Sequence, residues 1–134
     1  MKLSSKTITA IKLFIDLSEH CEEGFISLID VAKRKEISKK FLEQIVPLYK
    51  TKGLLICSRG NQGGYALGKP AKEIKLKDII YVSESSLQKD TYNYPPIDET
   101  ISALDNLIEE YLSSITLKDL TDKQKEIYIN SYII

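Results

Sequence analysis

The feature that most constrains the fold is a pair of short helices that the sequence predicts between residues 27 and 53. Ser27 can cap the first helix, because Asp30 three residues later gives a variant of the capping box. Ser38 can cap the second helix. The apolar residues of this second helix recur on one face with the period of an α-helix: Phe41, Leu42, Ile45, Leu48 and Tyr49. Two helices joined by so short a turn predict a helix-turn-helix.

A glycine-rich hairpin is predicted directly after the second helix. Leu54–Ser58 and Tyr65–Leu67 have the composition of short strands, and Arg59–Gly64 supplies the glycines that a tight connection needs. A hairpin in this place is the wing of a winged helix. We therefore predict a mainly α (α+β) fold, a winged helix-turn-helix with a two-stranded wing, over residues 1–84.

Two further helices complete this predicted domain. Ser4 or Ser5 can cap a first helix that ends near His20, and a fourth helix after Pro70 ends by Ser86. Pro47 lies inside the second helix of the pair. Because proline removes one backbone hydrogen bond, a kink or an early loosening is expected there.

The last part of the chain predicts a loop over residues 85–97 and a dimerisation helix with a tail over residues 98–134. The long helix is expected to begin at Asp98, and Thr116 with Asp119 predicts a short last helix. Apolar residues recur every three or four positions along the long helix: Ile101, Leu104, Ile108, Leu112 and Ile115. Since so long an apolar stripe needs a partner, we expect a homodimer.

Charge is distributed unevenly along a chain whose net charge is zero. Residues 1–82 hold 15 Lys and Arg against 9 Asp and Glu, whereas residues 83–134 hold 4 against 10. The segment Lys33–Lys77 alone holds 12 basic and 3 acidic residues. Such a segment can neutralise phosphates, although a solvated lysine face is the alternative. Together with the helix-turn-helix, it favours double-stranded DNA as the partner.

The predicted DNA contacts lie on the second helix of the pair and on the tip of the hairpin. Phosphate contacts are expected from Ser38, Lys39 and Lys40, and base contacts from Glu43 and Gln44. On the wing, Arg59 and Gly60 are expected at the minor groove, with hydrogen bonds from Asn61 and Gln62. The alternative for the tip is that turns favour Gly, Asn and Gln for conformational reasons.

Several other classes of protein are disfavoured. No apolar run approaches the roughly 20 residues that span a bilayer, so no membrane partner is expected. Cys21 and Cys57 have neither disulfide nor zinc spacing, which fits a cytoplasmic protein. No catalytic or metal-ligand spacing is present, and His20 is the only histidine, so we do not expect an enzyme.

Motifs along almost the whole chain resemble one known family. The resemblance is carried by Met1–Lys6, Ile37–Ser38, Phe41–Ile45, Gly53–Leu54, Arg59–Gly60, Gly63–Leu67 and Ser114–Leu120. The family is that of the Rrf2-type winged-helix transcriptional regulators, whose members include the iron–sulfur regulators IscR and NsrR and the cysteine-metabolism repressor CymR. The resemblance implies a homodimeric repressor on a palindromic operator. It further implies that Glu43 reads a base and that Arg59 enters the minor groove.

The chain departs from the family pattern at three places. Iron–sulfur members carry three cysteines in the loop before the dimer helix, whereas Ser85–Pro96 has none, so no cofactor is expected. Thr7–Thr9 stands where the family has a basic-aromatic Gly-Arg-Tyr, which removes one phosphate contact. Lys75 replaces the threonine that caps the fourth helix. The chain is therefore closest in character to CymR.

Three inputs remain open for such a cluster-free regulator. Cys21 or Cys57 could be a redox switch, although a buried structural thiol is favoured for Cys57. The tail Tyr132, Ile133 and Ile134 is similar to that of CymR and could dock a cysteine-synthase-like enzyme, the alternative being simple packing on the dimer. A small ligand could bind between the dimer helices and the DNA-binding domain. The alternative function is a protein-interaction adaptor that docks a metabolic enzyme.

Overall fold

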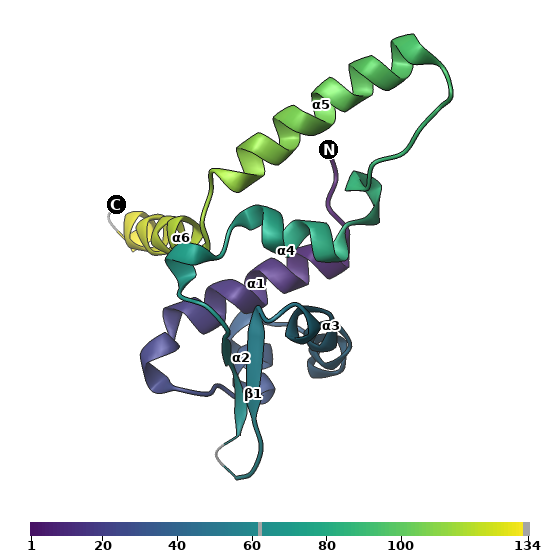
Figure 1. The fold of residues 1–134 in the computed structure, drawn as a ribbon. Coiled ribbons are helices and arrows are strands. Elements are labelled where there is room, and N and C mark those ends of the chain that lie inside the picture. The colour runs from purple at the N-terminus through teal and green to yellow at the C-terminus, as the bar shows by residue number, and fades with distance from the viewer. Residues whose placement is uncertain (62, 133–134) are drawn as a thin grey trace.

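Helix α1 (Ser5–Glu19) lies at the centre of the first half of the chain (Figure 1). In this computed structural model, which describes residues 1–61 and 63–132, α1 packs against α2, α3, α4 and α6. Ser4 caps α1 by accepting a hydrogen bond from the Thr7 backbone N–H, which confirms the predicted start. Leu13 and Phe14 are fully buried. The helix therefore holds the core around which the other elements assemble.

Helices α2 (Leu28–Lys35) and α3 (Lys39–Thr51) form the predicted helix-turn-helix. Ser27 and Ser38 cap them, and Glu36 in the turn adopts a left-handed φ of 55°. The expected early loosening at Pro47 is wrong, because α3 continues to Thr51. The proline ring lies on the exposed side, while Val46 and Tyr49 on the opposite side are buried and hold the helix in place.

The wing is an antiparallel pair of strands, β1 (Leu55–Ser58) and β2 (Gly64–Leu67). Ile26 extends this pair, since its backbone exchanges two hydrogen bonds with Tyr65, of 2.8 and 2.7 Å. Gly64 allows this close approach, because a Cβ atom there would collide with the Ile26 carbonyl. The base of the wing is thereby fixed to the segment that leads into α2.

Helix α4 (Leu76–Ser83) closes the winged-helix core. The Tyr49 hydroxyl donates to the Ile79 carbonyl at 2.8 Å, and the Tyr49 ring meets Phe14 edge-on at 5.0 Å. Three short 3₁₀ turns, η1 (Cys21–Glu23), η2 (Ala71–Glu73) and η3 (Ser85–Leu87), connect the larger elements. Contacts between α3 and α4 thus fix the orientation of α3.

Helices α5 (Pro95–Ser113) and α6 (Leu117–Tyr132) make up the last part of the chain. The predicted start of α5 at Asp98 is wrong by three residues, because proline is compatible with the first turn of a helix. Instead, the Asp98 carboxylate anchors the preceding loop by accepting the backbone N–H groups of Tyr92 and Tyr94. In Figure 1, α5 extends away from the body on the side opposite the wing.

Helix α6 is sixteen residues long, so the expectation of a short last helix is wrong. Its predicted capping box is confirmed, since Thr116 and Asp119 exchange hydrogen bonds of 2.9 and 3.1 Å. Leu117 is fully buried, and the Thr121 hydroxyl lies 2.9 Å from that of Ser18 on α1. No helix in the described part of the chain combines the length and apolar character needed to span a bilayer.

Candidate nucleic-acid interface

The exposed face of α3 carries all five residues predicted for the recognition helix. Ser38, Lys39, Lys40, Glu43 and Gln44 are solvent-exposed, and Leu42 and Ile45 on the opposite side are buried. The Ser38 hydroxyl accepts the Phe41 backbone N–H at 3.3 Å, which fixes the first turn of the helix. We call these five residues the recognition face. Its polar groups are presented on a rigid helix that core packing holds in place.

Within the recognition face, Lys39 and Glu43 form an ion pair. The Lys39 Nζ lies 3.2 Å from Glu43 Oε1, and both side chains are about half exposed, at 51% and 52%. An exposed pair of this kind is worth little, because solvent screens it. Both groups can therefore exchange this contact for a phosphate or a base edge at small cost.

The wing tip places Arg59 and Asn61 in solvent. Gly60 has a φ of 111°, a conformation that a residue with a Cβ atom rarely adopts. Gln62, the remaining predicted residue of the tip, lies outside the described residues. A guanidinium on a protruding tip can follow a groove that the body of the protein does not enter.

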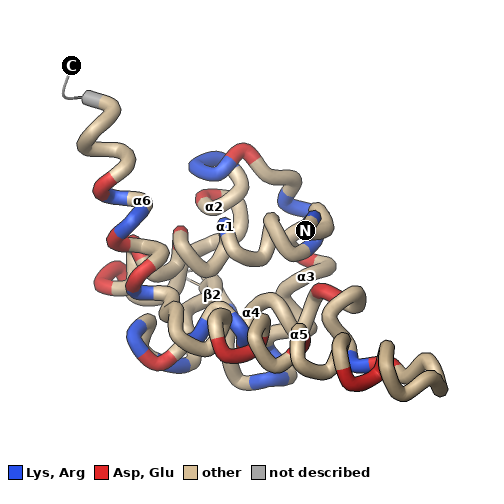
Figure 2. Tube along the Cα trace, turned by 90° about the horizontal axis from the view of Figure 1, so that it is seen from above, with Lys and Arg blue, Asp and Glu red and all other residues tan. Residues whose placement is uncertain are grey.

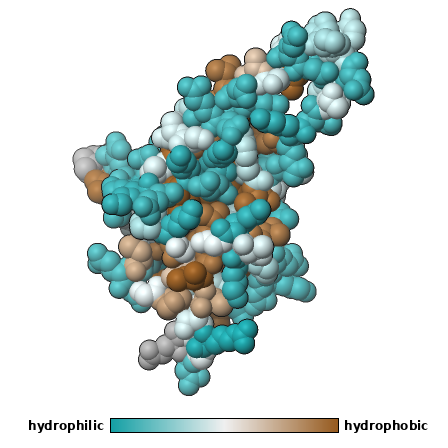
Figure 3. Space-filling view, in the orientation of Figure 1, coloured by the Kyte–Doolittle hydropathy of each residue, from teal (hydrophilic) through white to brown (hydrophobic). Residues whose placement is uncertain are grey.

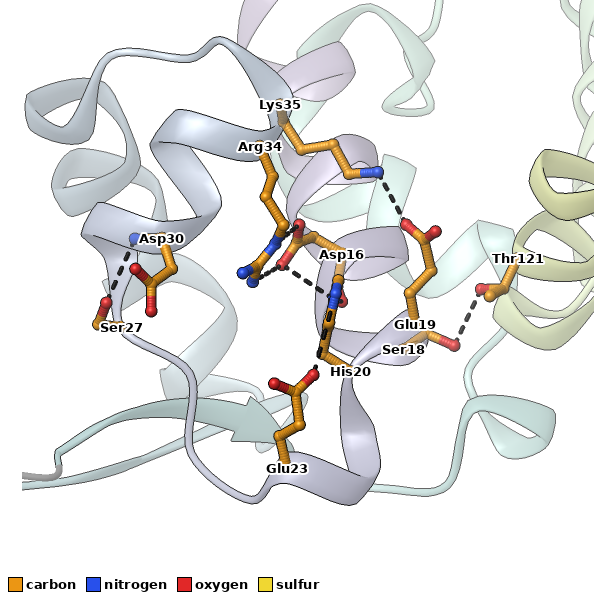
Figure 4. Close-up of polar contacts among 10 residues, drawn as sticks. All are labelled: Asp16, Ser18, Glu19, His20, Glu23, Ser27, Asp30, Arg34, Lys35 and Thr121. Atoms are coloured by element: carbon orange, nitrogen blue, oxygen red, sulfur yellow. Dashed lines mark hydrogen bonds and ion pairs between the residues drawn. The ribbon is translucent and has the colours of Figure 1, made fainter. Parts of the chain in front are cut away.

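An ion pair joins α1 to α2, the first helix of the helix-turn-helix (Figure 4). Arg34 donates two hydrogen bonds to the Asp16 carboxylate, from Nε at 2.9 Å and from Nη2 at 2.8 Å. The Asp16 side chain is completely buried, and the paired carboxylate raises the pKa of Arg34. Sequence reasoning missed this pair. The one available signal was a carboxylate on the apolar side of a predicted core helix.

The basic segment is partly neutralised inside the molecule. Besides Arg34, Lys35 pairs with Glu19 at 2.7 Å. Lys77 pairs with Glu109 on α5 at 2.7 Å, which raises the pKa of Lys77 and lowers that of Glu109. In Figure 2, acidic residues follow α5, and basic residues gather on the winged helix. The charge count therefore overstates what the segment can offer to DNA.

A second buried carboxylate joins the start of α1 to the end of α4. Glu84 Oε2 accepts hydrogen bonds from the Ser4 backbone N–H and the Thr7 hydroxyl, each at 2.9 Å. These bonds hold the pKa of Glu84 below its ordinary value. Thr7 is fully buried, whereas the neighbouring Ile8 is exposed. Ile8, the middle residue of the Thr7–Thr9 departure from the family pattern, therefore lies at the surface.

The predicted dimerisation stripe on α5 divides into two parts. Leu112 is buried, and Ile101 and Ile108 are half-buried. The prediction of Ile115 on this helix is wrong, because α5 ends at Ser113 and Ile115 lies half-buried in the connection to α6. Leu104 is 49% exposed and continues into Leu107 and Tyr111, each 64% exposed. Figure 3 shows apolar side chains reaching the surface on α5. We call Leu104, Leu107 and Tyr111 the outer stripe. The sequence-based prediction of the stripe followed one row of residues three or four positions apart, and it therefore omitted Leu107 and Tyr111.

The loop before α5 offers no thiolate for an iron–sulfur cluster. The two cysteines lie elsewhere, Cys21 exposed near the end of α1 and Cys57 half-buried in β1, which is less burial than the sequence suggested for Cys57. Among the described residues, no group of three or more His, Cys, Asp or Glu side chains is arranged to hold a metal ion. The residues of the loop therefore do not fit the cluster of iron–sulfur relatives.

A capped helix-turn-helix with an exposed recognition face beside a wing defines a winged-helix DNA-binding protein. The family model for Rrf2, described as an iron-dependent transcriptional regulator, matches residues 3–123. The chain belongs to the Rrf2 family of transcriptional regulators, and its fold and DNA-binding class are those of that family. The regulators it resembles are not enzymes.

Individual relatives agree with this assignment. CymR of Bacillus subtilis is 33% identical over 96% of this chain and 98% of the relative. IscR of Photorhabdus laumondii is 31% identical over 93% of this chain and 82% of the relative. Among solved structures, T. potens IscR superposes with a TM-score of 0.79 at 35% identity, covering 95% of this chain and 90% of that one. The structure of B. subtilis CymR gives the same TM-score at 31% identity, covering 92% and 98%.

Proposed function

We propose that this protein is a cytoplasmic repressor that binds a palindromic operator as a homodimer, without an iron–sulfur cluster. The observation that carries the proposal is the placement of two surfaces. The recognition face and Arg59 lie on the winged helix, and the outer stripe lies on α5, which extends from the opposite side of the body. Two copies joined through α5 would present two winged helices to one duplex.

The proposed contacts follow from the chemistry of each exposed group. Lys39 and Lys40 neutralise phosphates, and the capped start of α3 directs backbone N–H groups toward the same oxygens. Glu43 accepts a hydrogen bond from a cytosine amino group in the major groove. Arg59 enters the adjacent minor groove, where its charge is favoured. Ile8 occupies the surface position where the family pattern has arginine, so this chain lacks that phosphate contact.

Dimerisation is argued from the outer stripe. Leu104, Leu107 and Tyr111 are each about half exposed or more, on one side of a helix that carries no basic residue. Apolar side chains in such a row favour burial against another surface. A second copy offers an identical stripe, so a two-fold axis across α5 would cover both at once.

The absence of a cluster is argued from the loop chemistry, since thiolates hold iron–sulfur clusters and residues 85–94 contain none. Anaerobic reconstitution with iron and sulfide should therefore leave the purified protein without visible absorption bands. Stoichiometric cluster absorption would overturn this part of the proposal.

DNA binding is tested by fluorescence anisotropy across a salt series, with an operator selected from a pool of random duplexes. The affinity should fall steeply with salt, because phosphate neutralisation releases counterions. Arg59→Ala should weaken binding by roughly 1–3 kcal/mol. Lys123→Ala, an exposed lysine on α6, is the matched control and should leave affinity unchanged. Binding that is absent, or that does not depend on salt, contradicts the proposal.

A second candidate is an adaptor that docks a cysteine-synthase-like enzyme through the C-terminal segment. It is favoured by the exposure of Ile127, Tyr128 and Ile129 on α6, between 56% and 59%, and by similarity to a protein described as the global cysteine regulator of B. subtilis. Tyr132 is the last residue of α6, and Ile133 and Ile134 lie outside the described residues. Deletion of residues 133–134 should abolish enzyme binding in calorimetry and leave DNA binding intact.

A further inference from the structure

A groove of about 750 Å³ lies between the C-terminal half of α3 and the outer side of α4. It is distinct from the recognition face and from the outer stripe, since its lining includes no residue of either. Its volume falls within the range of small-molecule sites. The loop that leads to α5 contributes Gln88 to one edge. The groove therefore touches the recognition helix, α4 and the connection to the proposed dimer helix.

One part of the groove lining is apolar. Leu48 on α3 and Val82 on α4 are half-buried, and Leu54, at the entry to β1, is only 4% exposed. Tyr81 adds one aromatic ring. Its burial raises the pKa of the phenol, so the hydroxyl stays protonated and can donate a hydrogen bond. Such a lining favours a ligand with an apolar ring system.

The rim of the groove is basic. Lys52, Lys69 and Lys77 line it, and the lone acid among its described lining residues, Asp78, accepts the Lys75 backbone N–H at 2.9 Å. Lys77 already holds a carboxylate, that of Glu109 at 2.7 Å. Lys52 and Lys69 form no ion pair with any residue in the described part of the chain. The rim thus offers two unpaired ammonium groups beside one that binds a carboxylate.

We infer that this groove binds a small amphipathic anion, with a carboxylate, sulfonate or phosphate on an apolar body, and that this ligand is the regulator's input. The apolar body lies against Leu48 and Val82, and the anionic group lies at Lys52 and Lys69. A second copy's α5 fits less well, because Glu109 of the chain's own α5 already pairs with Lys77, one of the lining residues. A small molecule can bind at Lys52 and Lys69 and leave that ion pair in place.

The location gives the ligand a route to DNA binding, and this step rests on the proposed function. The groove is walled by the C-terminal half of α3 and is bridged to α5 by the Lys77–Glu109 pair. A ligand anion at Lys52 and Lys69 places a negative charge beside the Lys77–Glu109 pair and so changes how α5 is held against α4. Because α5 sets the spacing of the two winged helices in a dimer, the occupied and empty groove differ in operator affinity.

The site is tested with two fluorescent probes and the full chain. Anilinonaphthalene sulfonate has an apolar ring system with an anionic group, and N-phenylnaphthylamine has a similar ring system without charge. The sulfonate should bind more tightly, and salt should weaken it. Its backbone amide shifts in NMR should centre on Leu48, Val82 and Gln88. Equal affinity for the neutral probe, or shifts centred on the outer stripe, would overturn the proposal.

Variants separate the rim from general surface charge. Lys52→Gln with Lys69→Gln should weaken sulfonate binding by roughly fivefold to tenfold, the loss expected for two partly exposed charge contacts. Lys72→Gln with Lys123→Gln removes two exposed lysines outside the groove and should leave the affinity for the sulfonate unchanged. Circular dichroism verifies that each variant is folded. Equal weakening by both pairs contradicts a specific site.

The DNA readout distinguishes this inference from the proposed function. Saturating sulfonate should change operator affinity at least about threefold in wild-type protein, and not in the Lys52→Gln, Lys69→Gln variant at the same concentration. If the groove binds the probe but the protein binds no DNA, the ligand site is supported and the proposed function as a DNA-binding regulator is overturned. DNA binding without any effect of an occupied groove overturns the input role alone.

Discussion

Large apolar residues are buried in the winged helix, whereas several on helix α5 are exposed to solvent. In the first region, Leu13, Phe14 and Tyr49 are fully buried within one chain. On α5, Leu112 is the one buried residue, and Leu107 and Tyr111 are 64% exposed. The first region buries its apolar residues in one core, which Leu117 of α6 joins, whereas α5 presents an exposed apolar surface. Under the proposed function, folding and assembly therefore depend on different parts of the sequence.

The same contrast appears in the charges. Buried or partly buried ion pairs in the first region tie helix to helix, as Asp16 and Arg34 do. Helix α5 instead carries carboxylates on an exposed surface, with Glu109 as its link to α4. Removing a charge should therefore affect stability in the first region and assembly in the second.

Phe14→Ala should lower the free energy of unfolding by about 3–5 kcal/mol, because it leaves a cavity beside Tyr49 in a close-packed core. Leu107→Ala on α5 is the matched control in the second region. At a protein concentration where the chain is monomeric, it should cost less than about 0.5 kcal/mol. Urea unfolding measures both. Similar losses at the two sites would show that Leu107 is as important to the folded chain as Phe14.

Asp16→Asn should destabilise the protein by about 1–3 kcal/mol, since the Arg34 guanidinium loses its charged partner while the new amide stays buried. Asp122→Asn removes an exposed partner of Lys118 on α6 and should cost under about 0.5 kcal/mol. Thermal unfolding followed by calorimetry compares the two variants. A loss at Asp122 as large as that at Asp16 would contradict the assigned roles.

Ser38→Ala should cost about 1 kcal/mol by removing the cap of α3, and Ser38→Gly only a few tenths of that, because glycine is tolerated at a cap. Urea unfolding of the two variants gives the difference. If the alanine and glycine variants are equally stable, the hydroxyl does not act as a cap.

Glu84 should make stability depend on acid. The pKa of Glu84 in the folded state lies below its ordinary value. Its contribution to the free energy of unfolding is therefore present at pH values above the ordinary pKa and is lost as the pH falls through the lower, folded-state pKa. Wild-type protein should therefore lose more unfolding free energy between neutral and acidic pH than Glu84→Gln does. Parallel pH profiles for the two proteins would exclude this role for the hydrogen bonds from Ser4 and Thr7.

The local parts of the fold were predictable from the sequence because their determinants are close together in the chain. Ser27 and Ser38 act through residues three positions away, and the stripe on α3 has a helical period. The Asp16–Arg34 pair was not predictable, since eighteen positions separate its members and only the packing of α1 on α2 joins them.

The C-terminal errors have physical causes of their own. Pro95 and Pro96 indicated a break, but proline fits the first turn of a helix and here begins α5. Helix α6 was expected to be short, but it continues to Tyr132 although Ile127 and Ile129 near its end are exposed. The membership of the outer stripe depends on which side of α5 its own chain covers, and that is a tertiary property.

The central claim is that one region reads DNA and the other pairs two copies of the chain. Sedimentation and anisotropy of the Leu104→Asp, Leu107→Asp variant test it most directly, with duplexes that carry one or two selected half-sites. We predict a folded monomer that binds one half-site like a wild-type monomer and loses the tighter binding to two half-sites. A variant that stays dimeric, or that binds the two-half-site duplex with wild-type affinity, contradicts the account.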